Sequence, residues 1–225
     1  MNIVVLTGAG MSAESGLKTF RDANGLWEGH DVMQVASPEG WRADPALVLD
    51  FYNQRRRQLL EVSPNKGHLA LAHLEQQHTV QIITQNVDDL HERAGSSQVT
   101  HLHGELFKVR STKNASDIKE WKSDLNLGDS CSLGSQLRPH IVWFGEQVPL
   151  LETAASNVAL AEVLIIVGTS MQVYPAANLI HYAPADCPVY FIDPNPAITA
   201  TSRITVLAKT ATEGIPIVVD RLRQA

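Results

Sequence analysis

Three polar side chains follow one apolar run of this sequence and could bind a sugar or an amide. Gln85, Asn86 and Asp88 come directly after the run 80–84. Carboxamides and a carboxylate at a strand end can address ribose hydroxyls and a carboxamide group. The alternative is that Asn86 or Asp88 caps the next helix.

A histidine in the next apolar stretch is a candidate general base. His103 follows the run 99–102 and precedes a glycine, a place where an imidazole can face a cleft. Its unperturbed pKa near neutrality suits proton abstraction. His101 lies two residues earlier and would point the same way in a strand, so spacing does not separate the two histidines.

A glycine-rich turn near the start predicts a phosphate-binding site. Gly8, Gly10 and Ala13 follow the run 3–6 and fit the pattern G-x-G-x-x-G/A, in which a tight turn leads to a helix N-terminus with free N–H groups. The polar stretch 15–27 reads as a loop, whereas a hydride-transferring dehydrogenase would reach a second strand ending in an acidic residue.

The surrounding pattern predicts an α/β fold, with a Rossmann-like parallel sheet and a smaller inserted domain. Asp44 followed by Pro45 is expected to start one helix, and Asn65 is expected to cap another. The segment 108–136 is polar and looks like an insertion. The expected strands are 3–6, 80–84, 99–102, 163–167 and 189–192.

The helix that begins at Asp44 would place Tyr52 and Arg55 on one face, three residues apart. A guanidinium and a phenol are suited to a carboxylate. The alternative is a solvated basic face, because residues 55–57 are all arginine.

Composition narrows the function classes. The 225 residues carry a net charge of −6, which gives no electrostatic footprint for nucleic acid. Two cysteines, Cys131 and Cys187, make no disulfide framework, and we find neither a signal peptide nor an apolar run long enough for a membrane span. A cytoplasmic enzyme without nucleic-acid or membrane partners is expected.

Five ordered blocks make this chain resemble the sirtuins, NAD-dependent protein lysine deacylases, over nearly its whole length. Together they are far more specific than one glycine motif. The blocks are Gly8 to Ser12 with Phe20-Arg21, then 84–88, 102–105, 137–139 with 142–146, and 168–170.

The resemblance implies that NAD is the cofactor and that acylated lysine side chains of proteins are the substrates. His103 would deprotonate a ribose hydroxyl, and Asn86 would also be catalytic. The products would be nicotinamide, O-acyl-ADP-ribose and free lysine. The implied NAD-binding residues are Gly8, Ala9, Gly10, Ser12, Ala13, Phe20, Arg21, Gln85, Asn86, Asp88, Gly168, Thr169, Ser170, Asp193, Asn195 and Ala211.

The same resemblance assigns a substrate channel. Val142, Phe144, Gly145 and Glu146 would pair with an extended peptide by strand addition, although an apolar segment of this kind could also be a core strand. Tyr52-x-x-Arg55 resembles the subgroup that removes succinyl or malonyl groups. An NAD glycohydrolase or ADP-ribosyltransferase on the same fold is the alternative function.

Two departures from the family pattern are visible. Asp193 stands where sirtuins usually have Asn, so either Asp193 or Asn195 could bind the adenine ribose. The family's two Cys-x-x-Cys pairs are reduced to one cysteine, so no structural zinc is expected. Ser111, Asn114 and Gly134 occupy the other three places beside Cys131.

The expected domain boundaries follow from the resemblance. Segments 1–22, 61–106 and 139–225 would form the Rossmann-like domain, and 23–60 with 107–138 the small one. Without zinc, apolar packing would hold the insertion. Its expected anchors are Phe107, Val109, Ile118, Trp121 and Leu125.

Overall fold

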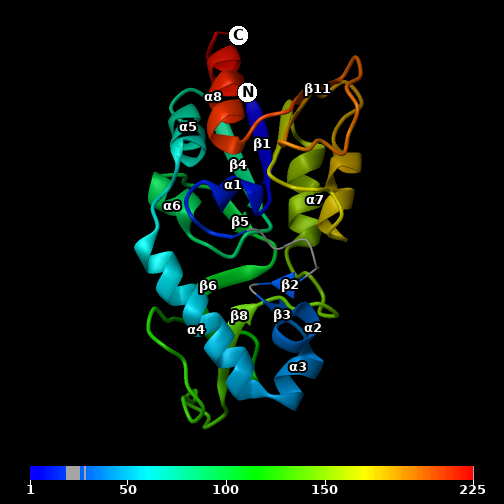
Figure 1. The fold of residues 1–225 in the computed structure, drawn as a ribbon. Coiled ribbons are helices and arrows are strands. Elements are labelled where there is room, and N and C mark those ends of the chain that lie inside the picture. Colours follow the sequence, from blue (N-terminus) through cyan, green and yellow to red (C-terminus); the bar gives the residue numbers. More distant parts are fainter. Residues whose placement is uncertain (19–25, 28, 225) are drawn as a thin grey trace.

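A six-stranded parallel sheet forms the larger part of the computed structural model, which describes residues 1–18, 26, 27 and 29–224. Its strands run in the order β11-β10-β9-β1-β4-β5 (Figure 1). All five expected strands are confirmed to within two residues, and β11 was not predicted. The strands are β1 (Asn2–Thr7), β4 (Thr79–Thr84), β5 (Val99–His101), β9 (Val163–Val167), β10 (Val189–Ile192) and β11 (Ile204–Leu207).

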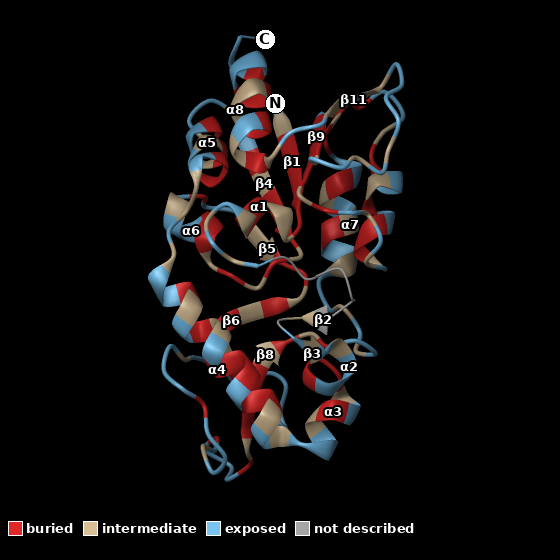
Figure 2. Cartoon of the chain, viewed as in Figure 1, coloured by how far each residue is buried: buried red, intermediate tan, exposed pale blue. Residues whose placement is uncertain are grey.

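Both faces of this sheet are covered, because successive apolar residues of a strand point to opposite sides. Ile3 and Val5 of β1 pack with helices α5 (Lys66–Leu74) and α8 (Ala211–Arg223). Val4 and Leu6 pack on the other side, with α7 (Leu151–Ala159) and the 3-10 helix η1 (Ala176–Tyr182). Figure 2 shows the resulting buried centre of the sheet.

The chain reverses direction across the sheet at β1. From β1 it proceeds to β4 and β5 on one side, and it later returns to β9, β10 and β11 on the other. Such a switch point leaves a crevice at the carboxyl ends of the two strands that flank it, where ligands bind in open α/β sheets. Gly8 and Gly168 are the residues that follow β1 and β9 there.

A second, smaller part lies at the other end of the molecule (Figure 1). It contains an antiparallel sheet in the order β7-β6-β8, a two-stranded sheet of β2 and β3, and helices α2, α3 and α4. The expected boundaries at 106/107 and 138/139 fall inside β6 and β8. The elements are β2 (Leu26–Trp27), β3 (His30–Asp31), α2 (Val32–Val35), α3 (Pro38–Ala43), α4 (Pro45–Glu61), β6 (Gly104–Ser111), β7 (Ile118–Glu120) and β8 (Leu137–Ile141).

Both expected helix starts are confirmed. The Asp44 carboxylate accepts the backbone N–H of Leu47 at 2.9 Å and caps α4. The Asn65 side chain accepts the backbone N–H of His68 and caps α5. In return, the backbone N–H of Asn65 donates to the His68 ring. None of the helices among the described residues is long and apolar enough to cross a membrane.

The polar insertion is held by packing and by hydrogen bonds between side chains. Val109 and Leu125 are fully buried in a cluster with Cys131. The Ser111 and Ser135 hydroxyls lie 2.8 Å apart, and Cys131 Sγ lies 3.0 Å from Ser135 Oγ. Ser111 and Cys131 are two of the four positions at which the family pattern would put metal ligands.

The other three expected anchors of the insertion differ in burial. Phe107 is buried as expected, and Trp121 packs against the Leu125 cluster while partly exposed. Ile118 is a correction, because its side chain is 43% exposed at an edge strand. Among the residues that the structure describes, no group of three or more His, Cys, Asp or Glu could hold a metal ion. Beside the single Cys131 thiol, the described part of the insertion offers the hydroxyls of Ser111 and Ser135, which are not the thiolate or imidazole ligands of a structural zinc; folding without zinc stays a prediction.

Candidate active site

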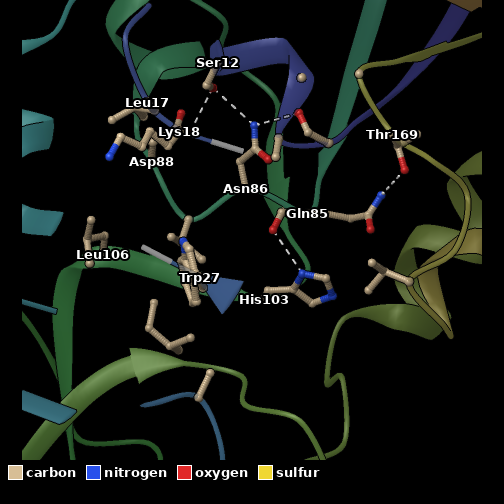
Figure 3. A pocket seen from close by; sticks show the side chains of 18 of the residues that line it. Ser12, Leu17, Lys18, Trp27, Gln85, Asn86, Asp88, His103, Leu106 and Thr169 are labelled. Atoms are coloured by element: carbon tan, nitrogen blue, oxygen red, sulfur yellow. Dashed lines mark hydrogen bonds between the residues drawn. The ribbon is translucent and has the colours of Figure 1, made fainter. Parts of the chain in front are cut away.

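A cavity of about 530 Å³ lies at the switch point and extends to β8 and the segment that follows it. Its size is typical of a ligand site. Figure 3 shows the polar side chains of the sheet edge around it. The predicted site residues that line it are Gly8, Ala9, Gly10, Ser12, Ala13, Tyr52, Arg55, Gln85, Asn86, Asp88, His103, Val142, Phe144, Gly145, Glu146, Gly168, Thr169, Ser170 and Asp193.

Two predicted residues that the structure describes, Ala211 and Asn195, are not among those that line the cavity. Ala211 is buried in the core as the first residue of α8, so its side chain packs inside the protein. Asn195 is also absent from the wall, and its backbone N–H donates to the Asp193 carboxylate at 2.8 Å. Of these two residues, Asp193 is the one that lines the cavity. Phe20 and Arg21 fall outside the described residues.

The glycines of the first turn are needed for contact between two loops. A Cβ on Gly8 would lie 2.6 Å from the Gly168 carbonyl oxygen, and one on Gly10 would lie 2.7 Å from Gly168 Cα. Gly168 itself has a φ of +63° and leaves no room for a side chain beside the Met11 amide. The turns after β1 and β9 therefore pack backbone to backbone.

The expected row of free amides at this turn is a correction. Helix α1 (Gly10–Ala13) is a single turn. The amides of Gly8, Gly10, Met11 and Ser12 all donate to backbone carbonyls within the protein. A pyrophosphate here would depend on fewer backbone donors than the motif predicts.

His103 lies at the cavity with one ring nitrogen held in place. Its Nδ1 lies 3.0 Å from the Gln85 carbonyl oxygen, which can only accept, so Nδ1 carries the proton and Nε2 keeps its lone pair (Figure 3). Burial lowers the pKa of His103, and the bond to Gln85 opposes this only in part. The ring is therefore neutral near pH 7 and able to accept a proton.

Asn86 is fixed by its side chain. Its Nδ2 donates to the Gly8 carbonyl oxygen at 3.0 Å and to Ser12 Oγ at 3.2 Å, which leaves Oδ1 for a ligand. Ser12 in turn donates to Asp88 Oδ2 at 2.9 Å. Asp88 also accepts the Leu90 amide at the start of α6 (Leu90–Ala94), so it both lines the cavity and serves the next helix.

A side-chain bond joins the two sides of the switch point. Gln85 Nε2, at the end of β4, donates to Thr169 Oγ1 at 3.2 Å, beyond the end of β9.

Asp193 follows the end of β10. Burial raises the pKa of its carboxyl group, and the hydrogen bond from the backbone N–H of Asn195 opposes this. A carboxylate at this strand end can accept two ribose hydroxyls.

The segment after β8 is not a core strand, because β8 ends at Ile141 and Gly145 has a φ of +86°. Its capacity for strand addition is smaller than expected. The amides of Val142, Trp143, Phe144 and Glu146 all donate within the protein. An added peptide strand would depend on the Gly145 amide and on carbonyl groups.

Glu146 braces this segment from within. Its carboxylate accepts from Arg138 at 2.7 and 3.1 Å, from Arg110 at 3.2 Å and from the Trp143 amide at 2.9 Å. The Arg138 guanidinium also lies 3.3 Å from the centre of the Trp143 ring. Glu146 therefore lines the cavity with its carboxylate already bound.

Trp143 is a cavity residue that the sequence interpretation passed over, although it lies inside a quoted block. Its indole N–H donates to the Tyr52 hydroxyl oxygen at 3.0 Å, joining the segment to α4. Other lining residues without a prior assignment include Lys18, Trp27 and Tyr174. These three residues are separated in the sequence, so no motif or spacing indicated that they would line the same cavity.

The three consecutive arginines of α4 do not form one basic face. Arg56 is fully buried and donates to the Leu106 carbonyl and to Asn53, whereas Arg57 is exposed and pairs with Asp124. Arg55 lies over the Phe51 ring and, with Tyr52, lines the cavity.

Comparison with known proteins identifies the family. The Sir2 family model matches residues 8–175. An NAD-dependent protein deacylase of Helicobacter pylori (strain ATCC 700392 / 26695) is 66% identical over 193 residues, 86% of this chain and 84% of the relative. One from Bacteroides thetaiotaomicron is 59% identical over 221 residues, 95% of this chain and 94% of the relative. This chain belongs to the Sir2 family.

Solved Sir2 structures share the fold of the whole chain. A Sir2 homolog–NAD complex superposes with a TM-score of 0.89 and 39% identity, covering 99% of this chain and 89% of the other. A mutant Sir2 homologue bound to ADP-ribose gives a TM-score of 0.90 at the same identity, covering 99% and 92%. The cavity of this Sir2 protein offers carboxamide, hydroxyl and carboxylate groups that fit a dinucleotide.

Proposed function

We propose that this protein removes succinyl and malonyl groups, as well as acetyl groups, from lysine side chains of proteins. Its enzyme class is NAD-dependent protein deacylase. The proposal adds to this class a preference for acyl groups that carry a carboxylate. The observation that supports it is the position of Tyr52 and Arg55 in the wall of the cavity that His103 also lines.

The hydrogen bond from Trp143 makes Tyr52 a donor toward the acyl group. Because the indole N–H occupies the Tyr52 oxygen, the hydroxyl proton of Tyr52 is left to point elsewhere. The Tyr52 side chain is fully buried in the wall of the cavity, so a bound carboxylate would reach its hydroxyl once neighbouring side chains shift. A hydrogen bond to a carboxylate is strong in such a dry place.

Arg55 supplies the charge. Its Nη1 donates to the Phe51 carbonyl oxygen at 2.9 Å, and its guanidinium is held against the Phe51 ring at 4.1 Å. A planar fork held in this way can bind a carboxylate in a bidentate manner. An acetyl group has no carboxylate and would gain nothing from Arg55.

The chain's own residues have separate roles in the proposed reaction. NAD supplies the ADP-ribose that takes up the acyl group as nicotinamide leaves. His103, with Nε2 unprotonated, accepts a proton from a hydroxyl in the cavity. Asn86 presents a carbonyl oxygen to the ligand, and Asp193 binds hydroxyls at the far strand end.

Arg55→Met tests the acyl preference. We expect kcat/KM with a succinyl-lysine peptide to fall roughly 10- to 150-fold more than with the acetyl peptide, for one charge-assisted bond of about 1.5–3 kcal/mol. Arg57→Met is the matched control, since Arg57 is exposed and its ion pair is worth little. Equal losses on both peptides would mean that Arg55 is structural.

Trp143→Phe is the second arm. It keeps an aromatic ring against Arg138 and removes the N–H that donates to Tyr52. The kcat/KM for the succinyl peptide should fall roughly 2- to 12-fold more than that for the acetyl peptide, as for one neutral hydrogen bond of about 0.5–1.5 kcal/mol.

The wild-type protein also tests the alternative function. If it releases nicotinamide from NAD without any peptide, the result would favour an NAD glycohydrolase instead.

A further inference from the structure

A second histidine lies directly behind the cofactor cleft, with both ring nitrogens engaged. His101 ends β5, is buried, and is not among the residues that line the cavity. Its Nδ1 lies 3.1 Å from the main-chain oxygen of Asn86, and its Nε2 lies 2.7 Å from Glu92 Oε1 on α6. Of the two histidines that spacing alone does not separate, His103 is the one that lines the cavity.

The two partners of His101 determine its charge. A main-chain carbonyl and an ionised carboxylate can only accept, so a ring bonded to both must carry a proton on each nitrogen. Burial opposes this charge, but the hydrogen bond and charge of Glu92 outweigh it, and the pKa of His101 is raised. The pKa of the Glu92 carboxyl is lowered in turn, by its hydrogen bond to His101 against the effect of burial.

Other ionisable groups around His101 do not change this assignment. Glu105 of β6 and the Asp88 carboxylate both act on His101 as negative charges. His91, on the same helix as Glu92, is kept neutral because burial holds its pKa well below the usual value. Lys108, bonded to Glu105 at 2.8 Å, also acts on Glu92 as a positive charge, and His101 is the cation that bonds to Glu92 directly.

His101 belongs to a series of contacts that hold the loop after β4. Three successive carbonyls of that loop accept from the segment that begins at β5: Gln85 from the His103 ring, Asn86 from the His101 ring, and Val87 from the Leu106 amide at 2.7 Å. The middle contact is the one that depends on a second proton.

We propose that His101, as an imidazolium held by Glu92, is a positioning residue for the reaction. It donates a hydrogen bond to the main-chain oxygen of Asn86 and so orients the Asn86 carboxamide toward the cofactor cleft. The Asn86 Nδ2 bonds to Gly8 and Ser12 complete this placement. The proposal goes beyond the acyl preference and does not depend on which acyl group is removed.

Loss of one proton would break the arrangement. A neutral imidazole has a single N–H, and the carboxylate of Glu92 competes for it more strongly than a carbonyl does. The Nδ1 lone pair would then face the Asn86 oxygen and repel it. The activity should therefore fall on the alkaline side as His101 deprotonates.

Glu92→Gln separates this effect from a structural one. The carboxamide of Gln can donate to a neutral Nε2, which leaves the Nδ1 proton for Asn86. We expect the wild type to show an alkaline fall in kcat/KM for NAD, measured with an acetyl-lysine peptide, and Glu92→Gln to lose that fall. His101→Ala should lower kcat/KM for NAD at least tenfold. His73→Gln, exposed on α5, is the control and should match the wild type.

A direct measurement on the protein without substrates completes the test. The ¹⁵N shifts of the His101 ring should report two protonated nitrogens at pH 6 in the wild type, since the pKa of His101 is raised above 6.5, and one in Glu92→Gln. A neutral His101 in the wild type would overturn the proposal. The same holds if Glu92→Gln keeps the alkaline fall at the wild-type pH. If His101→Ala does not fold, these two readouts still decide.

Discussion

His103 should act as a base whose pKa lies below the ordinary value for histidine. Burial lowers its pKa from 6.5, and the base works only in its neutral form, so the midpoint of the acid-side fall in kcat/KM should lie below pH 6.5. His103→Ala should lose about 10²- to 10⁴-fold in turnover while still binding NAD. A mutant with near wild-type turnover would remove His103 from the mechanism.

Residue types in the sequence could predict which side chains meet at the cavity, but not what their atoms are already doing. The polar residues after β4 and β9 meet as expected, since the carboxyl ends of parallel strands share one edge of the sheet. The amides of the first turn and of the segment 142–146 were assigned to ligands, and those of Gly8, Gly10, Met11, Ser12, Val142, Trp143, Phe144 and Glu146 prove to be bonded internally. Such pairing depends on distances that residue spacing does not contain.

At the scale of elements, helix α5 carries a titration that should govern acid stability. His68 is fully buried, and burial lowers its pKa to about 4, with the charge of Glu92 opposing. The unfolded chain takes up this proton below pH 6.5, whereas the folded chain does not until about pH 4. Lowering the pH across this window therefore favours unfolding, by roughly 3 kcal/mol in all.

His68→Gln tests this origin of acid lability. Glutamine can accept the Asn65 amide as His68 does, and it does not titrate. Denaturant unfolding at pH 6.5 and pH 4 should show that the mutant loses about 3 kcal/mol less than the wild type over this range. His73→Gln on the same helix is exposed and should behave as the wild type. Equal losses in all three proteins would assign the lability elsewhere.

Elements with a strong period were predictable, and those defined by partners were not. Strands β9 and β10 are found at their expected bounds, because short apolar runs between turns are typical of buried parallel strands. Strand β7 is exposed throughout and β6 continues across an expected domain boundary. Strand β7 pairs with β6, and β6 pairs with β8, both antiparallel. No local sequence pattern predicts which strands pair in this way.

For the molecule as a whole, we predict folding without structural zinc. Purified, untagged protein should contain well below one zinc per chain, and a chelator should leave both the activity and the unfolding midpoint unchanged. Leu125→Ala should instead lower the free energy of unfolding by about 2–5 kcal/mol, because Leu125 is fully buried where a metal would otherwise hold the small part together. Stoichiometric zinc would show that unrecognised ligands complete a site.

The central place of β1 in the sheet also bears on biosynthesis. Val4 pairs with Gln81 on one side and with Leu164, 160 positions later, on the other. A ribosome adding 5–20 residues per second needs on the order of 10 to 30 s to span that interval. Throughout it one edge of the first strand lacks its neighbour, so the nascent chain is open to aggregation and to chaperone capture. Chains arrested before β9 should accordingly be protease-sensitive, and those released after β11 should not.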